Sequence, residues 1–202
     1  MQNTDNQLID SYWELFIAES KSTERAFSFI YNHYSQNLYD YGIKLGYPEY
    51  VCKDTLHDTF YHLYVVRKKL SAVDKKASYL FKTFRNKLID TTRTKSNRNV
   101  NIDQIDLSDF SIKITALDTI IDEETTERLV ALVDNLLNSL TPHQKEAVYL
   151  RYMQNMSYDE IASILNITND SARKLVYRSL ENLRDKMIGV NYEGLLLLVL
   201  II

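Results

Sequence analysis

Glycine and proline are scarce in this sequence, with four and two residues respectively among 202. Both residue types punctuate hairpins and irregular loops, so their scarcity disfavours a β fold with many turns. The single cysteine, Cys52, excludes an internal disulfide and suits a reducing, cytoplasmic environment. The frequent Leu, Ile, Lys, Glu, Asp, Asn and Tyr residues instead favour an all-α protein with polar connections between its helices.

Long apolar segments are also lacking. The segment LLLLVLII at residues 195–202 is shorter than the roughly 20 residues of a transmembrane helix, so we expect no membrane span. The first residues, MQNTDNQLIDSYW, have neither the basic region nor the apolar run of a signal peptide. Two interpretations of the apolar tail stay open. It closes the core of the second domain, or it covers a domain or a partner and holds the protein inactive.

Charge is unevenly distributed along the chain, although the net charge is only −3. An acidic balance argues against a general nucleic-acid coat protein, which would be basic. Residues 82–98 nevertheless carry six basic side chains against one acidic side chain, whereas residues 101–127 carry eight acidic side chains against one basic side chain. This reversal indicates two surfaces that face different partners.

Hydrophobic periodicity predicts three helices in the first half of the chain. The first carries apolar positions from Phe27 to Leu45 and ends at the Gly46-Tyr47-Pro48 turn. The second covers residues 50–69, and the third covers residues 76–94. We expect them to pack as one helical domain over residues 1–98. Residues 99–122 lack periodicity and are rich in Asp and Ser, which predicts an acidic linker.

A second helical domain is predicted over residues 123–188, before the tail at residues 189–202. Thr141-Pro142 is typical of a helix start, because Thr can cap and Pro is tolerated at the first helical position. Ser157 and Glu160 have the spacing of a capping box. Asn166 is expected to adopt the left-handed conformation that ends the next helix, and Thr168 can cap the helix that follows.

A short helix, the turn Asn166–Thr168 and a longer helix together predict a helix-turn-helix. We expect Ile167 to fill the corner between the two helices. The second helix would bury its apolar side and turn a polar side toward the DNA major groove. The alternative is two packed helices with an ordinary solvated face. The side chains expected to meet DNA are Thr168, Asn169, Asp170, Ser171, Arg173, Lys174, Tyr177 and Arg178.

Three segments resemble, in the correct order, the extracytoplasmic-function (ECF) sigma factors of bacterial RNA polymerase. Residues 140–184, LTPHQKEAVYLRYMQNMSYDEIASILNITNDSARKLVYRSLENLR, resemble the fourth domain of that family. Residues 54–60, DTLHDTF, and residues 79–90, YLFKTFRNKLID, resemble two segments of its second domain. His57 replaces the usual Gln, Asn166 replaces a Gly, and Ala172 occupies a position where Val is frequent.

The resemblance implies a cytoplasmic, non-enzymatic protein that binds core RNA polymerase and promoter DNA. The first domain would dock on the clamp helices of the large polymerase subunit through Asp54, His57, Asp58 and Tyr61. The second domain would read the duplex minus-thirty-five element. The acidic linker would either mimic nucleic acid in the RNA channel or serve as a plain tether. An anti-sigma factor is a further partner that the resemblance allows.

The basic third helix would hold the melted strand of the minus-ten element. Bases that leave the stack need aromatic or apolar pockets, and their phosphates need cationic support. The side chains expected to supply these contacts are Tyr79, Lys82, Arg85, Asn86, Arg93, Lys95 and Arg98.

Two other functions account for part of the sequence. A free-standing helix-turn-helix regulator would explain residues 140–184 but not the two earlier segments. An interaction protein that binds only a regulator would use the helical domains without DNA. The four histidines match no standard metal motif, and no glycine-rich phosphate loop or nucleophile elbow occurs, so we expect no catalytic site, metal or cofactor.

Overall fold

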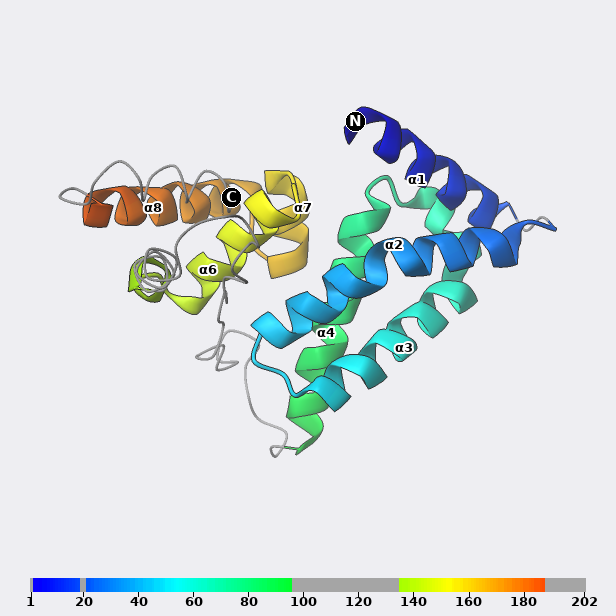
Figure 1. Cartoon of the computed structure of the whole chain (residues 1–202), viewed down its shortest axis with the longest axis horizontal. Helices are drawn as coiled ribbons and strands as arrows, with labels where there is room; N and C mark the ends of the chain where they lie inside the picture. Colours follow the sequence, from blue (N-terminus) through cyan, green and yellow to red (C-terminus); the bar gives the residue numbers. More distant parts are fainter. Residues whose placement is uncertain (1, 19–20, 96–134, 188–202) are drawn as a thin grey trace, which may run out of the picture. The chain divides into compact units, whose positions relative to one another are not determined.

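The computed structural model describes residues 2–18, 21–95 and 135–187 of the chain (Figure 1). The chain divides into two compact units. The first comprises Met1–Ile43 and Tyr47–Ile105, and the second comprises Lys44–Gly46 and Asp106–Ile202. The described ranges are helical and contain no strand, which confirms the predicted all-α class. The domain boundaries predicted after residues 98, 122 and 188 and the tail at 189–202 lie outside these ranges.

The first unit contains four α-helices and a 3₁₀ turn within its described residues. They are α1 (Gln2–Ile17), α2 (Thr23–Lys44), α3 (Glu49–Val66), η1 (Arg67–Ala72) and α4 (Lys76–Lys95). The periodicity correctly indicated α2, α3 and α4. Helix α3 ends three residues before the expected position 69, because the chain tightens into the 3₁₀ turn η1.

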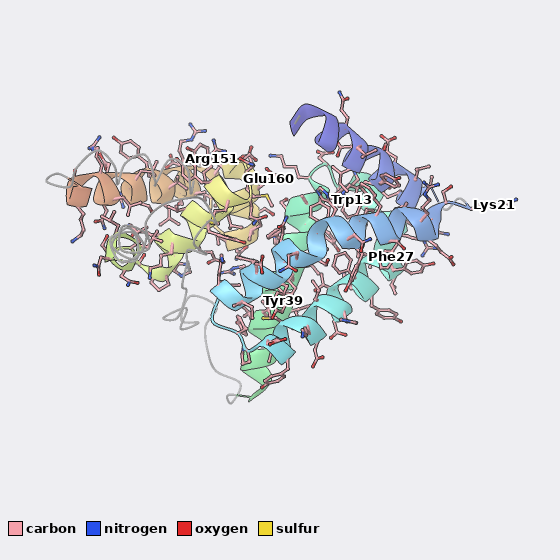
Figure 2. All side chains as sticks on the ribbon, in the orientation of Figure 1. Trp13, Lys21, Phe27, Tyr39, Arg151 and Glu160 are labelled. Atoms are coloured by element: carbon pink, nitrogen blue, oxygen red, sulfur yellow. The ribbon has the colours of Figure 1, made fainter. Side chains whose placement is uncertain are left out.

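Helix α1 was not predicted. Its apolar residues Ile9, Trp13 and Phe16 have helical spacing and are buried, Trp13 to 2% exposure. The Trp13 ring lies 6.0 Å from the Tyr34 ring of α2. Figure 2 labels Trp13 on α1 and Phe27 on α2. An aromatic core therefore ties the first helix to the rest of its unit.

Close packing around Gly42 brings α2 and α3 together. A Cβ atom at this position would lie 2.8 Å from the Cys52 sulfur, so a larger side chain would displace its neighbours. Gly46 has a φ of 85°, which ends α2 at the predicted turn. Burial raises the pKa of the Cys52 thiol to about 11, so this cysteine is a packing residue and not a reactive one.

The second unit contains α6 (Pro142–Val148), the π-helical segment η3 (Tyr149–Met153), α7 (Tyr158–Leu165) and α8 (Asn169–Met187). Its predicted helix ends are confirmed. Thr141 accepts a hydrogen bond from the Gln144 amide, and Ser157 accepts one from the Glu160 amide. Asn166 is left-handed, with φ 57° and ψ 43°. These local signals fix where α6 and α7 begin and where α7 ends.

The core of the second unit differs from the prediction at one corner. Ile161 and Ile164 of α7 and Ala172 and Val176 of α8 are fully buried, as expected. Ile167 is 38% exposed and so does not fill the corner between the helices. Its backbone amide donates to the Ala162 carbonyl at 3.0 Å and so helps to close the end of α7.

Candidate nucleic-acid interface

The polar face of α8 is built on a well-buried scaffold. Ala172, Val176, Ser179 and Leu183 recur at spacings of three and four residues and are buried. Side chains on the opposite side of the helix must therefore project into solvent. The predicted DNA-contact residues that are exposed are Thr168, Asp170, Ser171, Arg173, Lys174, Tyr177 and Arg178, and Asn169 is half-buried.

Hydrogen bonds hold three of these side chains at the start of α8. The Thr168 hydroxyl accepts from the Ser171 amide at 3.1 Å and donates to the Ser171 hydroxyl at 2.8 Å. The Asn169 amide group donates to the Asp159 carboxylate of α7. This bond places Asp159 beside the N-terminus of α8. The cap at Thr168 was predicted, whereas the link between α7 and α8 was not.

An ion pair occupies the next position on the polar face. The Lys174 ammonium lies 2.7 Å from the Asp170 carboxylate, one helical turn away. Both side chains are exposed, at 64% and 72% respectively. The hydrogen bond from Lys174, followed by its charge, holds the pKa of Asp170 below its ordinary value. Asp170 is therefore ionised at neutral pH on the face predicted to meet DNA.

Two arginines from different elements stack on one tyrosine ring. The guanidinium carbons of Arg151 in η3 and Arg173 in α8 lie 4.8 Å and 5.4 Å from the centre of the Tyr158 ring. Arg151, labelled in Figure 2, also donates to the Met156 carbonyl at 2.9 Å. Arg173 was predicted to contact DNA, whereas Arg151 and Tyr158 were missed, because only the fold brings the three together. Such a pair of oriented guanidinium groups suits phosphate binding.

The outer face of α3 carries the residues predicted to bind polymerase. Asp54, His57 and Asp58 are exposed, and Tyr61 is 72% exposed. The exposed Tyr50 falls on the same face by helical spacing and was missed. A signal was present in the sequence, because Tyr50 precedes His57 by seven residues, or about two helical turns.

Helix α4 presents part of the predicted minus-ten set on one face. Asn86 is exposed and Lys82 half-buried, while the Tyr79 hydroxyl lies 3.4 Å from Nε2 of His62. The side chains of Arg93 and Lys95 and the whole of Arg98 lie outside the described residues.

Arg85 requires a correction. It is only 5% exposed, because it shares the inner side of α4 with Phe81 and Leu88. A buried guanidinium is held by the protein and is not a surface cation for DNA phosphates. The periodicity of the apolar residues did not reveal this, since a long basic side chain at the edge of an apolar face can point either way.

Comparison with known proteins gives matches to a family, to a curated protein and to solved structures. Residues 131–183 match the family described as sigma-70, region 4. The "ECF RNA polymerase sigma factor SigM" of Bacillus subtilis (strain 168) is 23% identical over 157 residues, covering 77% of this chain and 91% of that protein. The solved structure of CnrH in complex with the cytosolic domain of CnrY has a TM-score of 0.55 at 17% identity, covering 89% of this chain and 97% of that chain. The resemblance to the ECF sigma factors is confirmed.

The region 4 match covers the helix-turn-helix segment of this chain. Residues 131–183 include all of α6, η3 and α7 and most of α8. The candidate interface on α8 therefore lies inside the matched region, together with Arg151 and Tyr158. The matches support a sigma-factor role in transcription initiation.

A further basic segment of the sigma-like chain precedes α4 and was not singled out from the sequence. Residues 67–75 include four basic side chains and one acidic side chain. Among them, Lys68, Lys69 and Lys75 are exposed. A charge count extended upstream of residue 82 would have found this segment. It adds positive charge next to the start of the predicted minus-ten helix.

Within the described residues, no helix is long and apolar enough to cross a membrane. The same part of the chain contains no group of three or more His, Cys, Asp or Glu side chains that could hold a metal ion.

Proposed function

We propose that this chain is a cytoplasmic sigma factor that binds core RNA polymerase, recognises promoter DNA, opens it and starts transcription. The observation that carries the proposal is the polar face of α8. This face is exposed, capped and supported by buried residues within the segment matched to sigma-70 region 4. No catalytic chemistry is needed, because the polymerase makes the RNA and the sigma factor supplies promoter specificity. We propose that residues 1–98 bind polymerase and the minus-ten element and that residues 99–122 form the linker. Residues 123–188 would bind the minus-thirty-five element, and residues 189–202 would form the tail.

We assign duplex recognition to α8. A helix fits the major groove, where base edges can be distinguished. Lys174 and Arg178 would donate to guanine or phosphate, and Thr168, Ser171 and Tyr177 would contact the backbone or base edges. Arg151 and Arg173, stacked on Tyr158, would bind phosphates along the groove.

We assign the melted minus-ten strand to α4 and the basic segment before it. Tyr79 offers a ring on which a base can stack, while Lys82 and Asn86 offer donors on the same face. Arg93, Lys95 and Arg98 would extend this surface. Both DNA contacts should weaken steeply as salt concentration rises, because cationic contacts release counterions from DNA.

We assign polymerase docking to the outer face of α3. Acidic side chains at Asp54 and Asp58 beside the exposed Tyr61 suit an arginine-rich partner helix. His57 and Tyr50 would contribute at the same face. An anti-sigma partner is also proposed, since CnrH was solved with the cytosolic domain of another protein bound.

Reconstitution with core RNA polymerase tests the proposal. The full chain should bind the core enzyme and direct transcription from a defined set of start sites, which sequencing of the transcripts will map. The double variant Lys174→Ala and Arg178→Ala should abolish this initiation on duplex promoters. Asp185→Asn is the matched control, since this exposed residue lies near the end of α8 beside Arg184.

A chain that binds promoter-like DNA but not core polymerase would instead be a free-standing helix-turn-helix regulator. A chain that binds neither would contradict both interpretations of α8.

A further inference from the structure

At the start of α8, some polar side chains are hydrogen-bonded within the protein and others point toward solvent. Asn169 donates to Asp159 of α7, and Ser171 is bonded to Thr168 through both its amide and its hydroxyl. The Asn169 amide group and the Ser171 hydroxyl oxygen are thus engaged in fixing the helix start, while the Ser171 hydroxyl keeps its own proton to donate. We expect base reading to fall largely on the other polar groups of the exposed face.

Asp170 and Lys174 are the first such groups. They stand one turn apart on α8, with carboxylate and ammonium 2.7 Å apart, and most of each side chain is exposed. An exposed pair at this spacing stabilises a helix only slightly. A carboxylate on a DNA-facing helix also opposes binding, because it repels phosphates. Asp170 lies in the first turn of α8, where a carboxylate also interacts favourably with the helix dipole, so this acid can serve both helix stability and base reading.

We propose that Asp170 and Lys174 act together as a reader of one G·C base pair. Asp170 would accept a hydrogen bond from the N4 amino group of cytosine, and Lys174 would donate to O6 and N7 of the paired guanine. The inference rests on the proposed function, since it requires α8 to lie in the major groove.

The spacing and polarity of the two charges match this base pair. In a G·C pair, the cytosine amino group and guanine O6 are neighbours, because they hydrogen-bond to each other. A carboxylate and an ammonium in direct contact place an acceptor over the amino group and a donor over O6 at once. In an A·T pair, the acceptor next to the amino group is thymine O4, which stands beside the C5 methyl group. The Lys174 ammonium over thymine O4 would have no N7 acceptor beside it, because N7 of this pair belongs to adenine.

The same pair lowers the affinity for DNA of arbitrary sequence. Lys174 is neutralised by Asp170 and is not an isolated cation for phosphates. At a G·C pair, Asp170 exchanges its contact with Lys174 for a hydrogen bond from cytosine. The Lys174 ammonium then donates to guanine in place of the carboxylate. Specificity thus arises partly from the unfavourable contacts at other base pairs.

Selection from a duplex library randomised across the minus-thirty-five region tests the inference. The full chain bound to core polymerase is compared with its variants Asp170→Ala, Asp170→Asn, Lys174→Ala and Asp185→Asn. The wild-type chain should enrich G·C at one position, and Asp170→Ala should reduce that enrichment by about tenfold. Asp170→Asn should move the preference from cytosine toward adenine, because an amide pairs with adenine N6 and N7. Lys174→Ala should lose the preference at the same base pair.

Asp185→Asn makes the same change of charge at the far end of α8 and should keep the wild-type preference. Circular dichroism of each variant verifies that α8 is still folded. If both Asp170 variants keep the wild-type preference at every position, the base-reading inference is wrong while the proposed function stands. If the wild-type chain on polymerase enriches no sequence, the proposed function fails and the inference with it.

Discussion

The outer faces of α8 and α4 are both candidate DNA surfaces, but they are built differently. At the α8 surface, side-chain contacts hold the polar residues. Asp170 pairs with Lys174 within the helix, and Arg173 stacks on Tyr158 of α7. On α4, Tyr79 and Asn86 stand above an aromatic core, and the Tyr79 hydroxyl makes a long contact of 3.4 Å with Nε2 of His62. Fixed polar geometry is what reading a duplex demands. A melted strand demands mainly a ring and nearby positive charge.

The two surfaces also depend on different supports. The α4 surface rests on a core of large rings, whereas the α8 surface rests on small aliphatic residues and on capping bonds. Large buried rings contribute more to stability than a single cap. Substitutions of the residues that support each surface should therefore lower the free energy of unfolding by different amounts.

Trp13→Ala should have the largest effect and should act on the first unit. Trp13 is 2% exposed, and its loss should lower the free energy of unfolding by about 3–5 kcal/mol. Hydrogen exchange measured helix by helix should show weaker protection in α1–α4. Tyr50→Ala, which removes an exposed ring in the same unit, serves as the control. Equal losses of protection in α6–α8 would contradict the independence of the two surfaces.

Tyr79→Ala should weaken binding of the melted strand by about 1–3 kcal/mol, the contribution of one stacked base. Tyr79→Phe keeps the ring, removes the contact with His62 and should retain most of the affinity. Fluorescence anisotropy with a single-stranded minus-ten oligonucleotide measures both, on the chain bound to core polymerase. Loss of duplex minus-thirty-five binding in Tyr79→Ala would show that the two surfaces are not separate.

Ser157→Ala should destabilise the second unit by about 1 kcal/mol, because it removes one helix cap. Ser157 accepts from the Glu160 amide and donates to the Glu160 carboxylate at 2.7 Å. Urea unfolding followed by hydrogen exchange in α7 and α8 measures the loss. Ser157→Thr keeps a hydroxyl at the cap and should behave like the original chain. An unchanged stability in Ser157→Ala would mean that packing alone sets the start of α7.

The smallest effect should come from pH at the Asp170–Lys174 pair. The folded-state pKa of Asp170 is lowered from 3.8, so the pair contributes fully above that value. The contribution is lost as pH falls through the lowered pKa, where the carboxylate becomes protonated. Carboxyl NMR titration should give a midpoint below 3.8, and Lys174→Ala should move it back toward 3.8. A midpoint that Lys174→Ala leaves unchanged would rule out the ion pair in solution.

The features predicted correctly are those that depend on neighbours in the sequence. The caps at Thr141, Ser157 and Thr168 and the left-handed Asn166 each involve atoms within about four residues. The exposed face of α8 follows from the period of its apolar residues. The family resemblance indicated which partners these faces would bind, namely core RNA polymerase and promoter DNA.

Some of the missed features join distant parts of the chain, whereas α1, Tyr50 and the basic segment before α4 had local signals in the sequence. Sequence by itself determined the helix class, the helix ends of the second unit and the polar side of α8, because backbone hydrogen bonding and helical periodicity are local. Tertiary structure alone decided that Arg85 is buried, that Ile167 is exposed and that Arg151 and Arg173 share the Tyr158 ring. Each of these depends on which helix packs beside another, and no short-range spacing encodes that choice.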